Sequence, residues 1–233
     1  MPFFYMDYWY IVLVIPAVIF SMIAQFKVTS TFNKYSKVLS KRGITGQQAA
    51  RKILDSNGLY DVRIEQVSGN LTDHFDPKAG VIRLSDSVYA SSSVAAVGVA
   101  AHEAGHAVQH AVGYSPIKLR TAIIPICNIG SNLAMPLVLI GLVLSFEGLA
   151  MLGVLLFGLS VLFQLVTLPV EFNASSRAMA ALTSSGMLYE DEAKGTKKVL
   201  GAAAMTYVAA LAVALANFLR LLLIVTGGRN RRD

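Results

Sequence analysis

The sequence predicts an α-helical integral membrane protein with about four transmembrane helices and a small α+β unit. Of its 233 residues, 55% are hydrophobic and only 15% are charged, and the mean hydropathy of +0.56 exceeds what the core of a soluble domain requires. Four apolar runs reach the roughly 20 residues that a helix needs to cross a bilayer. One polar stretch of about ninety residues between the first two runs is long enough to fold against the membrane helices.

The apolar runs divide the chain into five expected segments. They are an N-terminal transmembrane anchor (1–26), a cytoplasmic α+β segment (27–120), a transmembrane hairpin (121–169), a second cytoplasmic segment (170–201) and a C-terminal transmembrane helix with a basic tail (202–233). A cleaved signal peptide is the alternative for the first run. An anchor is favoured, because no basic residue precedes the run and no small-x-small cleavage site follows it before Lys27.

The basic residues predict the orientation in the membrane. Those that closely follow the first run are Lys27, Lys34, Lys37, Lys41 and Arg42. Because Asp7 is the sole charge before that run, the positive-inside rule places the N-terminus outside and the segments 27–120 and 170–201 in the cytoplasm. The net charge of +6 therefore indicates membrane flanks and no nucleic-acid partner. The arginines at 229–232 disagree with the rule if the fourth run crosses.

The polar segment 27–120 carries signals for two helices and two strands. The helix signals are a capping box that begins at Thr45 and N-cap candidates among the serines at 91–93. The strand signals are short apolar or alternating runs bounded by turn residues. The predicted elements are a helix over 46–56, a strand over 61–67, a strand over 81–84 and a helix from about 94 to 113.

The second predicted helix contains an H-E-x-x-H motif, formed by His102, Glu103 and His106. On a helix, histidines at i and i+4 share one face about 6 Å apart, which suits a single Zn²⁺ ion. Glu103 is then placed as the general base toward a water molecule on that ion. The alternative is that both histidines are polar helix residues paired to backbone or solvent. We favour the metal site, because two of the four histidines stand at ligand spacing around a glutamate.

A catalytic zinc site normally has a third protein ligand. His110 lies on the same helix about 12 Å beyond His102 along the axis, so it cannot share the ion, and we expect it to pack or to orient a ligand. Glu147 is excluded, because it lies roughly 30 Å away if the hairpin spans. Glu171 directly follows the third run on the side of His102 and is the best candidate. A helix-start carboxylate favoured by the macrodipole is the alternative.

At these residues the chain resembles the YugP-like family of neutral zinc metallopeptidases of bacterial membranes. The stretches that carry the resemblance are LTDHFDP at 71–77, IRLS at 82–85, VAAHEAGHAVQ at 99–109 and LPVEFNAS at 168–175. Together they are more specific than H-E-x-x-H alone. More distantly, the chain resembles the HtpX and Ste24 membrane proteases, whose glutamate ligand lies in an E-x-x-A-D pattern after a membrane hairpin.

The resemblance implies a zincin-like catalytic unit that holds one Zn²⁺ ion with His102, His106 and Glu171. Ser175 stands where the more distant pattern has Asp, so a carboxylate that orients a metal-bound histidine is absent or comes from elsewhere, with Asp73 and Asp76 as candidates.

In zincin-like folds the strand before the metal helix commonly lies at a sheet edge, where it pairs with the peptide substrate. We therefore expect the strand over 81–84 at an edge. Arg177 is a candidate to stabilise the oxyanion, and the alternative is a lipid-headgroup or salt-bridge role. His74 is a candidate to line the cleft, and the alternative is that it only caps a turn.

The sequence thus predicts a zinc-dependent membrane endopeptidase in the bacterial inner membrane, with its active site on the cytoplasmic side. The expected partners are a polypeptide substrate, which is a membrane or misfolded protein, and the lipid bilayer. An intramembrane protease is less well supported, because polar residues flank the motif. The alternative from another class is a non-enzymatic zinc-binding scaffold or transporter, in which Gln164, Asn217 and Arg220 line a polar path.

Overall fold

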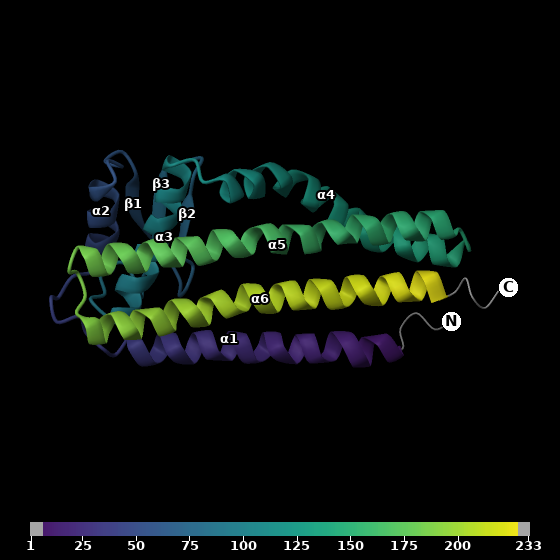
Figure 1. The fold of residues 1–233 in the computed structure, drawn as a ribbon, viewed down its shortest axis with the longest axis horizontal. Helices are drawn as coiled ribbons and strands as arrows, with labels where there is room; N and C mark the ends of the chain where they lie inside the picture. Colours follow the sequence, from purple (N-terminus) through teal and green to yellow (C-terminus); the bar gives the residue numbers. More distant parts are fainter. Residues whose placement is uncertain (1–6, 228–233) are drawn as a thin grey trace. The chain divides into compact units, whose positions relative to one another are not determined.

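The computed structural model describes residues 7–227, and the basic tail at 229–232 lies outside them. Four long helices dominate the fold, together with two shorter helices and a small sheet (Figure 1). The elements are a short π-helix (Tyr10–Val14), α1 (Ile15–Tyr35), α2 (Gly46–Ser56), β1 (Arg63–Val67), β2 (His74–Asp76), β3 (Val81–Ser85), α3 (Val94–Ala111), α4 (Ser115–Val143), α5 (Glu147–Ser184) and α6 (Glu190–Gly227).

Four helical stretches are long and apolar enough to cross a membrane: α1 with the π-helix before it, α4, α5 and α6. Each covers most of one of the four predicted apolar runs. α5 does not end at Pro169 but continues to Ser184, and α6 begins at Glu190, well before its apolar run. A helix can continue past the bilayer when its polar part packs on protein, so apolar length gives only a lower bound for helix length.

The chain divides into two compact units. The first comprises residues 1–24, 119–168 and 206–233, and the second comprises residues 25–118 and 169–205. α5 contributes to both, and the division falls between Leu168 and Pro169, inside the helix.

The first unit is a set of apolar helices, and Asp7 and Arg220 form an ion pair within it. Its buried cluster joins α4, α5 and α6 through Val138, Val154 and Leu221. Arg220 of α6 donates two hydrogen bonds to Oδ2 of Asp7, at 2.6 and 2.8 Å, and its guanidinium also lies over the ring of Tyr10. The charge of Arg220 is therefore neutralised within the unit.

The second unit contains a three-stranded sheet in the order β1-β3-β2. β3 is parallel to β1 and antiparallel to β2, and Ile82 and Leu84 of β3 are fully buried in the core with α2 and α3. The expectation that the strand over 81–84 lies at an edge is wrong, because β2 covers its outer side. β2 has three residues, too few for a period-two pattern to reveal it in the sequence.

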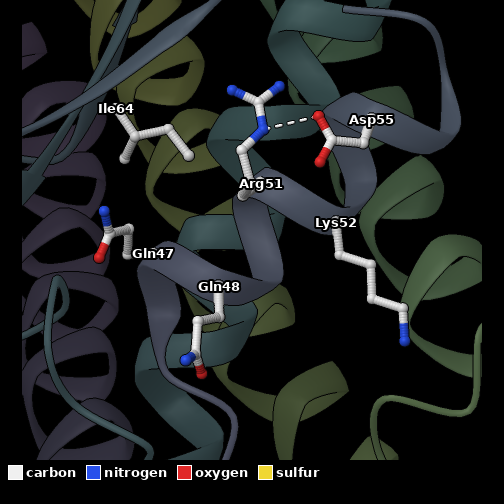
Figure 2. A pocket seen from close by; sticks show the side chains of 6 residues that line it. All are labelled: Gln47, Gln48, Arg51, Lys52, Asp55 and Ile64. Atoms are coloured by element: carbon white, nitrogen blue, oxygen red, sulfur yellow. Dashed lines mark ion pairs between the residues drawn. The ribbon is translucent and has the colours of Figure 1, made fainter. Parts of the chain in front are cut away.

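α2 covers this core and is held by its N-terminal cap and by contacts of Arg51 on its outer face. Its N-terminus has the predicted capping box, in which Thr45 and Gln48 bond each other's backbone N–H groups. The outer face of α2 lines a surface pocket, where Arg51 forms an ion pair with Asp55 one turn later (Figure 2). The guanidinium of Arg51 also donates to the carbonyls of Leu59 and Val62, so it ties α2 to the loop that leads into β1.

Candidate metal centre

α3 carries the H-E-x-x-H motif through the core of the second unit. Ser93 caps its N-terminus, because its hydroxyl accepts a hydrogen bond from the backbone N–H of Ala96. His102 and His106 follow one turn apart, with ring centroids 4.7 Å from each other and rings nearly perpendicular. Their side chains are only 14% and 12% exposed, so both imidazoles lie inside the protein with a small opening toward solvent.

Glu171 of α5 meets both histidines. Its Oε2 lies 3.3 Å from Nε2 of His102 and 3.5 Å from Nε2 of His106, and one donor atom from each of the three residues lies within 4.8 Å of the others. Donor atoms around a tetrahedral zinc ion at about 2.1 Å lie about 3.4 Å apart. The spacing and the chemistry of these two nitrogens and one carboxylate oxygen therefore fit a zinc ion.

A glycine allows α3 and α5 to approach this closely. A Cβ atom at Gly105 would lie 2.7 Å from the backbone carbonyl oxygen of Ala174, so there is no space for a side chain. Gly105 lies between the two histidines in sequence, and Ala174 is three residues after Glu171. The small residues of both helices thus place the carboxylate beside the imidazoles.

The outer nitrogen of each imidazole has its own partner. Nδ1 of His102 lies 3.1 Å from Oγ of Ser175, and Nδ1 of His106 lies 3.0 Å from Oε1 of Gln109. Because an amide oxygen can only accept, Nδ1 of His106 donates to Gln109. Nε2 then donates to Glu171 when the ring is protonated, and in the neutral ring it keeps the lone pair that a metal ion can bind. Ser175, which replaces the Asp of the related pattern, provides the corresponding contact for His102.

The two carboxylates considered for this orienting role bond elsewhere. Asp73 accepts hydrogen bonds from the backbone N–H and the hydroxyl of Ser85, and Asp76 pairs with Arg83 and with the turn that follows β2. Burial raises the pKa of the Asp73 carboxyl despite these bonds. Neither residue orients His102 or His106, because the contacts of both are made at the sheet.

The surroundings of His106 favour a cation. Burial lowers the pKa of its imidazole, but the hydrogen bond to Glu171 and the negative charges of Glu103 and Glu171 outweigh this effect, so the pKa is raised. A metal cation is attracted by the same charges and competes with a proton for Nε2.

Glu103 is a buried carboxylate whose oxygens accept no hydrogen bond from the described residues. Its residue surface is only 8% exposed, and it forms no hydrogen bond or ion pair with any residue in the described range 7–227. Its charge acts on His106, which places it beside the cluster. A buried carboxylate without a partner is costly unless something else binds there, so Glu103 is available to a water molecule or a ligand.

Gln109 joins the cluster to a polar chain along α5. It is fully buried, and its amide nitrogen donates to the carbonyl of Val170 at 2.8 Å and to Oδ1 of Asn173 at 3.0 Å. Oδ1 of Asn173 also accepts a hydrogen bond from Nε of Arg177 at 2.8 Å. Arg177 is thus connected to His106 through two side chains, although it is not part of the three-residue cluster.

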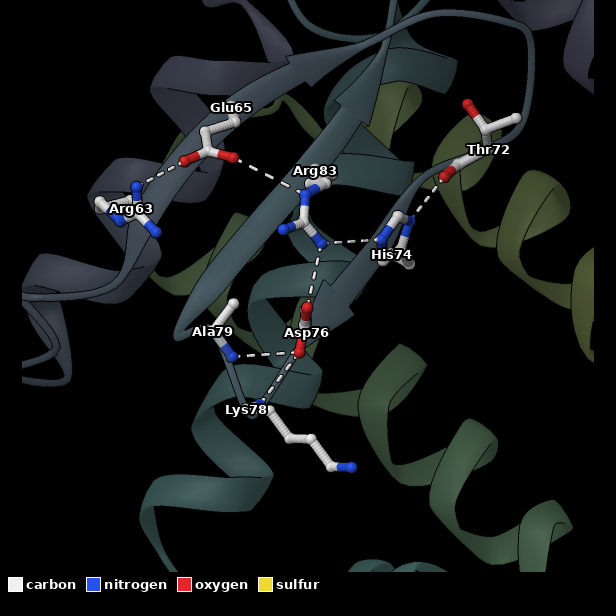
Figure 3. Close-up of polar contacts among 8 residues, drawn as sticks. All are labelled: Arg63, Glu65, Thr72, His74, Asp76, Lys78, Ala79 and Arg83. Carbon is white, nitrogen blue, oxygen red and sulfur yellow. Dashed lines mark hydrogen bonds and ion pairs between the residues drawn. The ribbon is translucent and has the colours of Figure 1, made fainter. Parts of the chain in front are cut away.

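His74 lies on the sheet and is not part of the cluster. Nδ1 of its ring contacts the carbonyl of Thr72, and Nε2 lies 3.4 Å from the guanidinium of Arg83 (Figure 3). Successive side chains of a strand point to opposite faces, and Phe75 packs against the core with Ile82. His74 therefore points to the opposite face, and its catalytic role stays a prediction without a supporting contact.

His110 and Glu147 are also outside the cluster. The ring of His110 packs edge-on against Phe75 of β2, with centroids 5.5 Å apart, as expected for a packing residue. Glu147 begins α5 and belongs to the first unit.

Two contributors were missed in the sequence. Gln109 is assigned no role at the site from the sequence, although a glutamine three residues after a ligand histidine on the same helix is a usable signal. Asn173 gave no signal, because its role depends on how α5 docks on α3.

Two imidazoles and a carboxylate around one point, with an unpaired glutamate beside them, form the donor set of zinc metallopeptidases of the H-E-x-x-H class. The chain belongs to the family described as "Putative neutral zinc metallopeptidase", whose model matches residues 10–226. It is 51% identical over 221 residues to "Putative membrane protease YugP" of Bacillus subtilis (strain 168). The matched residues make up 95% of this chain and 98% of the relative. No solved structure gives a significant match.

Proposed function

We propose that this protein is a zinc-dependent endopeptidase that hydrolyses peptide bonds of membrane or membrane-proximal proteins. The observation that carries the proposal is the convergence of Nε2 of His102, Nε2 of His106 and Oε2 of Glu171, at distances that suit one zinc ion. Membership of a zinc metallopeptidase family and the close similarity to a membrane protease support the same chemistry.

The proposed mechanism assigns each residue a separate task. His102, His106 and Glu171 would hold the zinc ion, which would supply a Lewis acid for a water molecule and for the peptide carbonyl. Glu103 takes a proton from the attacking water molecule through its carboxylate and passes it to the leaving amine. Ser175 and Gln109 hold the imidazoles in place. The terminal nitrogens of Arg177 have no hydrogen-bond partner within the described residues and are available to an oxyanion.

The free edge of the sheet gives the substrate a place to bind. β2 pairs with β3 on one side, and its Phe75 contacts His110, which lies one turn after His106 on α3. An extended peptide that added to β2 would run beside the metal helix. β1 is less suitable, because β3 separates it from β2.

We place this site on the cytoplasmic side of the bacterial inner membrane. The proposal rests on the basic residues after α1 and on the positive-inside rule. The four helices that can cross a membrane and the similarity to a membrane protease support a multi-pass membrane location.

A transporter or inactive scaffold is less well supported. The amide of Asn217 donates to the carbonyl of Val213 in its own helix, and Arg220 is neutralised by Asp7, so both make contacts within the protein. An intramembrane protease is also less well supported, because α3 is not among the helices that can cross a membrane.

The test is zinc content and peptide cleavage of the purified full-length protein beside its Glu103→Gln variant. The variant should bind zinc like the parent but lose nearly all turnover, because the base is removed while the ligands remain. Cleavage by the variant at the parent rate would contradict the mechanism. Zinc binding without cleavage by the parent would favour the zinc-binding scaffold alternative, and absence of both zinc and cleavage would contradict the proposal.

A further inference from the structure

A groove of about 450 Å³ lies between the polar ends of α1 and α6, in the second unit and apart from the metal centre. Lys27, Thr31 and Lys34 line it from α1 at spacings of four and three residues, which place them on one face of the helix. Lys198 and Gly201 line it from α6. Three lysines therefore line one cavity whose volume is in the range of small-ligand pockets.

These three lysines have no carboxylate partner. Among residues 7–227, no acidic side chain forms an ion pair with Lys27, Lys34 or Lys198, whereas the nearby Lys41 and Lys194 pair with Asp191 and Glu190. The groove thus has a concentrated positive charge that the protein does not neutralise, and an anion is the ligand that this charge favours.

The position of the groove at the ends of two apolar runs indicates where the anion comes from. Lys27 is the first charged residue after the apolar run of α1, and Lys198 is the last before the apolar run of α6. Phe26, directly before Lys27, is 76% exposed, as expected for a side chain that faces lipid. Lysines at such a border lie at the depth of the headgroups.

We propose that this groove binds the phosphate of an anionic lipid headgroup. The three lysines neutralise the phosphate, and the hydroxyl of Thr31 is available as a donor within the groove. Space for the headgroup is left at Gly201, where a Cβ atom would meet nothing within 4 Å. The acyl chains then follow the apolar surfaces of α1 and α6 into the bilayer.

The test is native mass spectrometry of the full-length protein in neutral detergent with equal amounts of phosphatidylglycerol and phosphatidylethanolamine. The parent should retain phosphatidylglycerol preferentially. In the triple variant Lys27→Gln, Lys34→Gln, Lys198→Gln, the retained amount of phosphatidylglycerol should fall by about tenfold or more, because each lysine near the membrane surface contributes to anionic-lipid binding. The matched control replaces Lys37, Lys78 and Lys197, three lysines that do not line the groove, and should retain phosphatidylglycerol like the parent.

A second variant tests the groove without a change of charge. Gly201→Leu fills the open space and should also lower retention of phosphatidylglycerol, with an unchanged or higher Tm. Equal losses in the groove triple variant and its control, or full retention in both groove variants, would overturn the proposal. A further experiment titrates the protein with inorganic phosphate. If phosphate binds to the parent, does not bind to the triple lysine variant and is not displaced by phosphatidylglycerol, the groove binds a soluble phosphate and the lipid proposal is overturned. Zinc content and cleavage should not change in these variants, so the outcome is independent of the protease assignment.

Discussion

Oε1 of Gln109 lies 3.0 Å from Nδ1 of His106, and the same side chain donates to the backbone of α5 beside Glu171. One fully buried amide therefore contacts a histidine of the proposed metal site and the helix that carries the carboxylate. Outer partners of metal-bound histidines fix the tautomer and the ring orientation. Gln109 is a positioning residue in the proposed mechanism, since its contacts are to the histidine and to α5.

We expect Gln109→Leu to weaken zinc binding by about 10- to 100-fold, the usual cost of losing such a partner. Gln109→Glu separates the two tasks of the side chain, because it keeps an acceptor for His106 but loses the donor to α5. It should retain more of the zinc affinity than Gln109→Leu. Competition with a chromogenic chelator measures the zinc affinity of both variants. Equal zinc affinity of Gln109→Leu and the parent would show that Gln109 does not support the metal site.

Glu171→Ala should lose zinc as well as activity, since it leaves two imidazoles without a third protein ligand. His110→Ala is the matched control, because its ring packs on Phe75 outside the cluster. Zinc per protein should be measured after dialysis against a weak chelator. Full zinc in Glu171→Ala together with loss in His110→Ala would refute the ligand assignment.

Gly105→Ala should destabilise the protein by about 1–3 kcal/mol, because the added methyl group meets the backbone of Ala174 and forces α3 and α5 apart. Zinc affinity should fall with it, since Glu171 moves with α5. Gly201→Ala is the control for the general effect of glycine removal from a helix, and it should raise Tm because nothing opposes the new side chain. A Tm of Gly105→Ala at or above that of the parent would show that the contact is not tight.

The proposed orientation can be tested with single cysteines in a Cys127→Ala background. Ser68 and Lys197 are exposed in the second unit, and Gly148 is exposed in the first turn of α5. An impermeant thiol reagent on intact cells should label Gly148→Cys and miss Ser68→Cys and Lys197→Cys, while permeabilised cells should label all three. The reverse pattern would place the active site outside. Thr196 is unsuitable for this experiment, because it is fully buried.

Local signals predicted the elements of the polar segment well. The helix over 46–56 is confirmed to the residue, because its capping box and stop are contained in its own sequence. The strand over 81–84 is confirmed within one residue, but its central position in the sheet is not visible locally. The three-residue β2 was missed for lack of a pattern.

The sequence also allowed us to predict which residues form the three-residue cluster. The spacing of His102 and His106 is a property of one helix, and charge and topology left few candidates for the third position. By contrast, the contacts of Ser175, Gln109 and Asn173 depend on the antiparallel docking of α5 on α3. Such contacts between distant segments have no local sequence signature.

Pro169 has a mechanical consequence for the candidate site. It lacks the amide hydrogen that would bond the carbonyl of Leu165, so α5 bends most easily there, at the residue where the second unit begins. Glu171 follows two residues later and is attached to α3 through Gly105 and Gln109. We therefore expect strain from a bilayer of changing thickness to be absorbed at this hinge before it reaches the carboxylate. The geometry of the proposed metal ligands would then depend little on the lipid composition around the helices.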